Sequence, residues 1–102
     1  MDMPVYKFWR MKYTGAWYRL SPEEQQKLLA QGEEALKQVG GKLIVMAVTV
    51  WADEKWNGFG VEQYPNMDAV MQHTQLLWKL NWFHYIESES TLGVEMTPEM
   101  WG

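Results

Sequence analysis

The sequence contains no cysteine, so neither disulfide bonds nor thiolate metal sites can form. It also lacks any run approaching the ~20 apolar residues needed to cross a membrane, and its first ten residues, MDMPVYKFWR, lack the apolar segment of a signal peptide. Basic residues are few. Nine lysines and arginines against thirteen acidic residues give a net charge of −4, which argues against nucleic-acid binding. We therefore expect a cytoplasmic protein with neither a membrane nor a nucleic-acid partner.

Aromatic residues, by contrast, are abundant for a chain of this length. They make up 15% of the 102 residues and include seven tryptophans, which is more than one small core requires. The length fits a single domain over residues 1–102. Either both faces of a sheet are covered, or the aromatic side chains line a pocket or a subunit interface.

Local signals divide the chain into alternating strands and helices. Ser21 and Glu24 match a capping box at the start of a helix, and the Gly-Gly pair at 40–41 ends it. Pro65 ends a strand, because proline has no N–H to donate to a sheet, and Asn66 is a favourable cap for the helix that follows. The expected strands are 5–13, 42–51, 59–64 and 86–94, and the expected helices are 22–39 and 67–80.

The order of these elements, β-α-β-β-α-β, predicts an α+β fold of the ferredoxin-like kind, with a four-stranded antiparallel sheet and both helices on one face. The strand at 42–51 is apolar on both faces, as in a strand buried on both sides, and the strand at 5–13 nearly so. One chain has nothing left to cover the second face of the sheet. We therefore expect a homodimer in which two sheets pack face to face.

His73 is the histidine that lies within an apolar face of a helix. Helical spacing places it between Val70, Leu77 and Leu80, so its ring should point inward or toward the edge of a pocket. Two interpretations stay open. His73 is either a core histidine bonded to a backbone carbonyl, or a residue that faces a ligand.

The architecture, with the second sheet face buried in a dimer, resembles the dimeric α/β-barrel superfamily. Glu62, Tyr64, Ala69 and His73 stand at the spacing of a motif in its antibiotic-biosynthesis monooxygenase family. The run at 82–93, WFHYIESESTLG, is similar to uncharacterised stress-responsive barrel proteins. The first resemblance implies a cofactor-independent monooxygenase or isomerase acting on an aromatic or polyketide-like molecule. The second implies a non-catalytic, stress-responsive barrel protein that binds a hydrophobic small molecule.

In this superfamily the pocket lies between the sheet and the helices, and the resemblance implies roles for several residues. His73 would act as a general base, Tyr64 would hydrogen-bond the substrate's oxygen, and Arg10 would stabilise an enolate or phenolate. The predicted ligand-binding residues, which would stack on a ring, are Trp51, Trp78 and Trp17. The alternatives are a Tyr64 hydroxyl in water, an Arg10 ion pair with a glutamate, and tryptophans that simply fill the core.

No metal or other cofactor is expected, and haem bound through His73 in an aromatic pocket stays an open alternative without a second cue. His73 and His84 are eleven residues apart and have no companion at the spacing of a zinc or iron site. The glycine-rich run at 58–60 lies inside a strand rather than before a helix, so it does not match a phosphate-binding loop.

Overall fold

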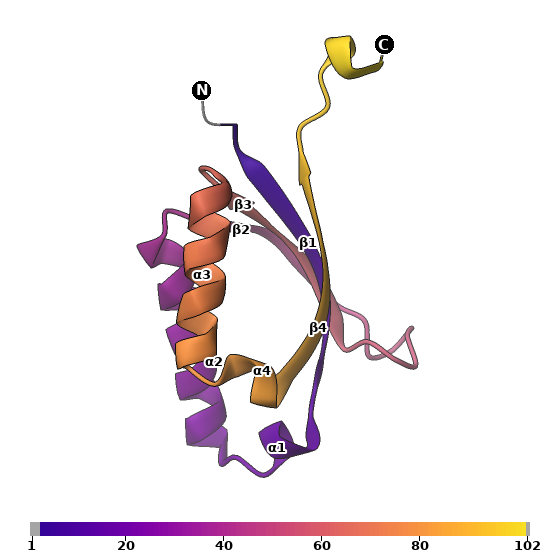
Figure 1. Ribbon diagram of the computed structural model, residues 1–102. Coiled ribbons are helices and arrows are strands. Elements are labelled where there is room, and N and C mark those ends of the chain that lie inside the picture. The colour runs from indigo at the N-terminus through magenta and orange to yellow at the C-terminus, as the bar shows by residue number, and fades with distance from the viewer. Residues whose placement is uncertain (1–2, 102) are drawn as a thin grey trace.

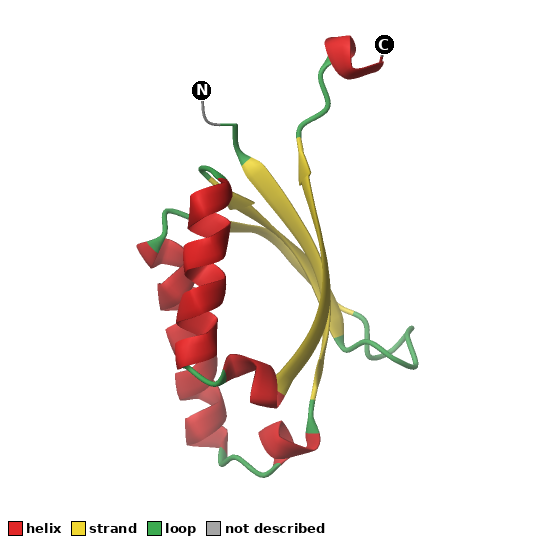
Figure 2. Cartoon of the chain, viewed as in Figure 1, coloured by secondary structure: helices red, strands yellow, loops and turns green. Residues whose placement is uncertain are grey.

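The computed structural model describes residues 3–101, which form a four-stranded antiparallel sheet with two long helices on one face (Figure 1, Figure 2). The spatial order of the strands is β2-β3-β1-β4. This is the predicted βαββαβ architecture. The elements are β1 (Val5–Tyr13), α1 (Gly15–Tyr18), α2 (Pro22–Gln38), β2 (Lys42–Val48), β3 (Gly58–Tyr64), α3 (Met67–Lys79), α4 (Trp82–Tyr85), β4 (Ile86–Val94) and a 3₁₀ turn, η1 (Pro98–Trp101).

The two long helices begin where the sequence predicts. Ser21 and Glu24 form the full capping box at the start of α2, with each side chain bonded to the other's backbone N–H. The side chain of Asn66 accepts from the backbone N–H of Ala69 at 2.9 Å and so caps α3. Gly40, just beyond α2, has a φ of +78°, a conformation that glycine adopts without strain. Short-range signals therefore set these boundaries.

β2 differs from the prediction in length and in burial. It ends at Val48 rather than at residue 51, because the chain turns there: the Thr49 carbonyl accepts the backbone N–H groups of Ala52 and Asp53. It is also an edge strand that is exposed along almost its whole length within the chain. The apolar pattern at 42–51 therefore does not reflect burial between two layers of the same molecule.

The apolar core fills only one end of the space between the sheet and the helices. Its cluster joins the paired strand residues Val5 and Tyr64 to Leu36 of α2 and to Ala69 and Val70 of α3. Tyr64 has no exposed surface and is the largest fully buried side chain among residues 3–101. At the other end, α1 and α4 lie close together where the chain passes between the layers (Figure 1). The volume between these two ends is a cavity.

Candidate functional site

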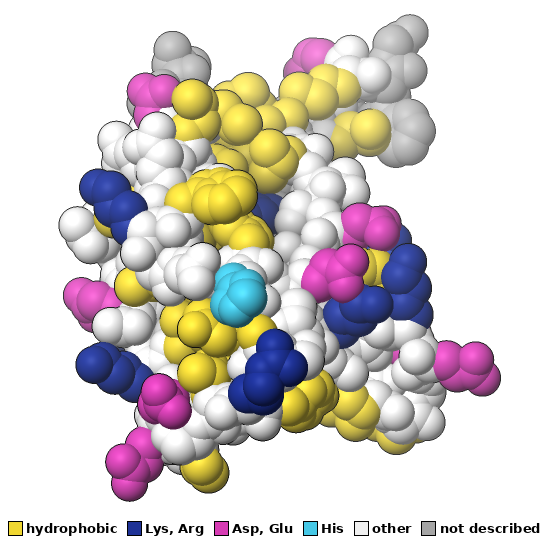
Figure 3. All heavy atoms as spheres, turned by 60° about the horizontal axis from the view of Figure 1, so that its bottom comes forward, with side chains coloured by type: hydrophobic (Ala, Val, Ile, Leu, Met, Phe, Trp, Pro, Cys, Tyr) yellow, Lys and Arg dark blue, Asp and Glu magenta, His cyan; other side chains and the backbone are white. Residues whose placement is uncertain are grey.

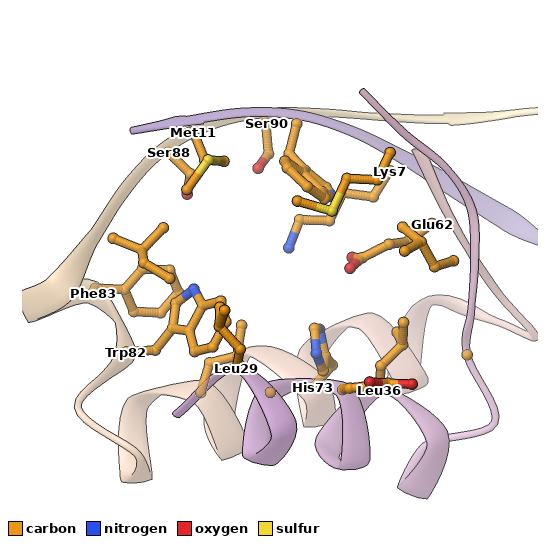
Figure 4. A pocket seen from close by; sticks show the side chains of 18 of the residues that line it. Lys7, Met11, Leu29, Leu36, Glu62, His73, Trp82, Phe83, Ser88 and Ser90 are labelled. Carbon is orange, nitrogen blue, oxygen red and sulfur yellow. The ribbon is translucent and has the colours of Figure 1, made fainter. Parts of the chain in front are cut away.

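A cavity of about 500 Å³ lies between the sheet and the helices. Most of its wall is apolar and includes Leu29, Leu77, Trp9, Trp82 and Phe83. Its polar lining includes Lys7 from β1, Glu62 from β3 and His73 from α3. The other polar lining residues are Glu33, Lys37, Lys42, Ser88 and Ser90. Figure 4 shows Lys7 and His73 pointing into the space from opposite sides, with Trp82 and Phe83 at one end and Glu62 toward the other. Such a space suits a flat apolar molecule that carries one polar group.

Strand register explains why Lys7 and Glu62 meet although they are far apart in the sequence. In the antiparallel pairing of β1 with β3, Lys7 lies directly opposite Glu62, and Trp9 lies opposite Gly60. Alternate residues of a strand share a face, so Lys7, Trp9 and Met11 all face the cavity. His73 reaches the same group from the buried side of α3, where only 3% of its surface is exposed.

Tyr64 links the carboxylate to the histidine. Its hydroxyl donates to Glu62 Oε1 at 2.6 Å and lies 2.8 Å from Nδ1 of His73. A tyrosine hydroxyl has one proton, and a neutral His73 ring has one N–H, so the tautomer of His73 decides whether the ring donates to Tyr64 or to the Gly32 backbone. The chain Glu62–Tyr64–His73 thereby holds the orientation of the ring.

The surroundings shift the pKa of each of these groups. Burial and, to a lesser extent, the positive charge of Lys7 together lower the pKa of His73 from 6.5 to about 4, against a hydrogen bond to the Gly32 backbone that raises it. Burial also lowers the pKa of Lys7, against the opposing charge of Glu62. The pKa of Tyr64 is raised by burial and by its contact with Glu62. At neutral pH the imidazole is therefore uncharged and can accept a proton.

The arrangement combines a proton acceptor with a cation in one apolar space. A neutral imidazole can remove a weakly acidic proton from a bound molecule. A cation beside it can stabilise the oxyanion that results, and this effect is strong where water is excluded. The site therefore has the groups needed for enolisation or deprotonation of a phenol.

Of the predicted catalytic residues, the structure brings His73 and Tyr64 together but not Arg10. Arg10 lies on the opposite face of β1, where its guanidinium is 3.0 Å from Glu89 and 5.5 Å from the centre of the Trp56 ring. It does not line the cavity. Tyr64 lies behind His73 and Glu62 rather than on the cavity wall, so its hydroxyl meets those two residues.

The three predicted ligand-binding tryptophans also lie elsewhere. Trp17 is buried and stacks on Tyr13, with 4.2 Å between ring centres. Trp51, in the connection after β2, is 84% exposed, and Trp78 is 67% exposed on the outer side of α3. None of them lines the cavity. The prediction gave them a ring-binding role because they are tryptophans. The residue type does not show in which direction a side chain points.

Trp9 and Trp82 are the tryptophans on the cavity wall, and each lies against a glycine. A Cβ added to Gly60 would overlap the Trp9 ring, and one added to Gly32 would overlap the Trp82 ring. The sequence analysis missed Lys7 and these two rings as site residues, and it named Glu62 only as part of the motif. Lys7 and Trp9 are two residues apart in one strand, so the sequence indicates that they lie on the same face of the sheet. It does not indicate whether that face meets the helices.

Three further features of the described chain bear on partners. None of the helices within residues 3–101 is long and apolar enough to cross a membrane. Figure 3 views the lower end of the molecule, and on this face basic and acidic side chains lie among hydrophobic ones, without a large patch of either charge. In the same described range, no three histidine, cysteine, aspartate or glutamate side chains gather at a possible metal site.

Neither a protein-family model nor a curated protein matches this sequence. Solved structures do. A protein of unknown function from Rhodopseudomonas palustris has a TM-score of 0.68 at 14% identity, and the match covers 96% of this chain and 86% of that one. Chlorite dismutase from Candidatus Nitrospira defluvii, in complex with imidazole, has a TM-score of 0.74 at 11% identity, covering 95% of this chain but 42% of that one.

This chain thus spans less than half the length of the chlorite dismutase that it matches. At sequence identities this low, the comparison supports a shared fold but does not support a shared chemistry. Together with the strand order, the comparisons show that the chain has a ferredoxin-like α+β fold.

Proposed function

We propose that the protein is a small cofactor-independent enzyme, a monooxygenase or an isomerase, that acts on an aromatic or polyketide-like molecule in the cavity. The observation that carries this proposal is a buried, uncharged His73 facing Lys7 across an apolar space of about 500 Å³. The spacing of Glu62, Tyr64 and His73 that resembles the monooxygenase motif supports it, because these three residues form one hydrogen-bonded chain.

In this mechanism His73 accepts the acidic proton of the bound molecule, and Lys7 stabilises the enolate or phenolate that forms. Lys7 thus takes the role that the sequence analysis assigned to Arg10. Tyr64 holds the histidine ring in place rather than binding the substrate directly. Trp9 and Trp82 offer their rings to the flat part of the ligand. The anion then takes a proton at another carbon, or reacts with dioxygen.

The second candidate is a non-catalytic barrel protein that binds a hydrophobic small molecule. One observation favours it: Tyr64 and Glu62 already provide hydrogen-bond partners inside the chain, so His73 has a structural role without any substrate. On this alternative the polar chain only shapes the cavity. The two candidates differ in one respect that can be measured, which is proton removal from the ligand.

We expect a thermal-shift screen to separate both candidates from a protein that binds nothing. The compounds are aromatic acids, quinols, polyketide-like rings and haemin, tested on the wild type, on His73→Gln and on the exposed-site control His84→Gln. A ligand at a hundredfold excess over its Kd stabilises the folded state by about 2.7 kcal/mol. A shift for one chemical class that is lost in His73→Gln and kept in His84→Gln supports a site at His73.

For each compound that binds, exchange of its acidic C–H for deuterium in D₂O, followed by NMR, distinguishes enzyme from binding protein. The enzyme proposal requires exchange that the wild type accelerates and His73→Gln does not. Binding without accelerated exchange favours the second candidate. If no compound shifts the melting temperature of the wild type, both candidates are contradicted for these classes of ligand.

We infer in addition that the protein forms a homodimer through the sheet face opposite the helices. By strand alternation this face carries Phe8 of β1, Val45 of β2 and Phe59 and Val61 of β3, with 5.9 Å between the two phenylalanine ring centres. Phe8 and Val45 remain 39% and 46% exposed in the single chain. An apolar area of this kind is typical of a subunit interface. A second copy, packed sheet against sheet, would cover it.

The dimer proposal predicts that Phe8→Glu produces a monomer, because the substitution places a charge in the centre of the apolar face. Met71→Glu, on the exposed side of α3, is the matched control and should remain dimeric. Light scattering coupled to size-exclusion chromatography measures the mass of each. A wild type that runs as a monomer at tens of micromolar, or a Phe8→Glu variant that stays dimeric, would contradict the interface.

A further inference from the structure

Two lysines on the cavity wall, the half-buried Lys7 and the exposed Lys42, form no ion pair within the described residues. Among residues 3–101, no side chain forms a hydrogen bond or an ion pair with the ammonium group of Lys7, whereas Lys12 and Lys37 pair with Glu87 and Glu33. Glu62 lies directly opposite Lys7 across the strands, but its Oε1 accepts the Tyr64 hydroxyl instead. The amine points into the cavity (Figure 4).

The surroundings of this amine favour its uncharged form. The cavity wall is mostly apolar, so solvation of the ammonium is weaker than in water, and burial lowers the pKa of Lys7. Only the uncharged amine is a nucleophile, and each unit by which its pKa falls increases that form about tenfold at neutral pH. Lysines in apolar pockets use this property to react with carbonyl groups.

We propose that Lys7 is an amine nucleophile that forms an imine with an aldehyde or ketone held in the cavity. Its nitrogen lone pair attacks the carbonyl carbon, and a C–N bond forms as the carbonyl π electrons move to oxygen. His73 accepts a proton from the nitrogen and returns it to that oxygen. The oxygen then leaves as water with the second N–H proton, and the C=N bond of the imine remains. The reaction needs no oxidant or reductant.

The imine proposal rests on the cavity of the proposed function, but it assigns a different chemistry to Lys7. In the proposed function Lys7 acts as a cation beside an oxyanion, and no covalent bond forms. A protein that binds rings without reacting at Lys7 would leave the proposed function intact and would overturn the imine proposal. A protein that reacts at Lys7 but does not accelerate deuterium exchange would support the imine proposal and contradict the proposed function.

Trapping with sodium cyanoborohydride tests the proposal, because this reagent reduces an imine to a stable secondary amine. The protein is incubated with 2-naphthaldehyde as the probe, and peptide mass spectrometry measures the modification at each of the seven lysines. We expect Lys7 to be modified faster than exposed Lys79, because burial lowers the pKa of Lys7. The Lys12→Met control should keep the fast site, and Lys7→Met should lose it.

Glu62→Gln provides a second readout that a purely structural lysine would not give. The negative charge of Glu62 raises the pKa of Lys7, so its removal should increase the rate of modification at neutral pH and move the rate profile to lower pH. Modification of Lys7 no faster than that of exposed lysines would overturn the proposal. So would a rate in Glu62→Gln that is equal to or below that of the wild type, with circular dichroism showing that the variant is folded.

Discussion

Replacing Tyr64 with alanine should lower the free energy of unfolding by about 4 kcal/mol, a loss typical of a buried aromatic side chain. Tyr64 has no exposed surface, and it belongs to the cluster that joins both long helices to the sheet. The substitution would leave a cavity among Val5, Leu36 and Val70 and would remove the hydroxyl between Glu62 and His73. Urea denaturation at one protein concentration measures the loss, because association would also contribute to stability.

Tyr64→Phe separates the hydroxyl from the ring. We expect it to cost about 1–3 kcal/mol, because it leaves the Glu62 carboxylate and the ring nitrogen of His73 without their shared partner. Tyr6→Phe is the matched control. The Tyr6 hydroxyl is only partly buried and accepts one bond, from Gln63 at 3.2 Å, so its loss should cost less. Equal costs for the two variants would contradict the role given to the Glu62–Tyr64–His73 chain.

The stability of the wild type should fall more steeply in acid than that of His73→Gln. Burial lowers the pKa of His73 to about 4, whereas in the unfolded chain it is about 6.5, so between these values the unfolded state binds the extra proton. The contribution of His73 is therefore complete above about pH 6.5 and is lost as the pH falls to about 4. The shift corresponds to about 3 kcal/mol over this window.

Denaturation curves at intervals from pH 4 to pH 7 measure this slope for both proteins. Their carboxylates titrate alike, so the difference between the two slopes isolates His73. The charged and titratable groups that face the ring, Lys7, Glu62 and Tyr64, are unchanged in the variant. His84→Gln, at an exposed position, should keep the slope of the wild type. Parallel curves for the wild type and His73→Gln would show that the ring is not buried in its neutral form.

Elements whose limits depend on local contacts were predicted closely. The capping box at Ser21 and the break at Pro65 act within a few residues, and β1 and β4 cover the expected ranges 5–13 and 86–94. The strand at 42–51 was predicted too long because a turn, in which the Thr49 carbonyl accepts the N–H groups of Ala52 and Asp53, ends it early. Its apolar sequence was also read as burial on both sides, whereas within the single chain β2 is exposed along almost its whole length.

The site was predicted in part. The spacing of Glu62, Tyr64 and His73 predicted residues that the structure does bring together, because positions two apart on β3 share a face and the turn to α3 is short. Arg10 and Lys7 were both visible as cations on the first strand, but they are three residues apart and point to opposite faces. Only pairing with β3 decides which of them meets the helices.

By itself, therefore, the sequence determined the order of the elements, the ends of both long helices and a histidine on a buried helical face. The tertiary structure decided which residues surround that histidine: Lys7 rather than Arg10, and Trp9 and Trp82 rather than Trp51, Trp78 and Trp17. The physical reason is that helix capping and periodicity act over a few residues, whereas strand register and helix rotation depend on contacts between distant segments. In a strand, a shift of one residue turns every side chain to the other face.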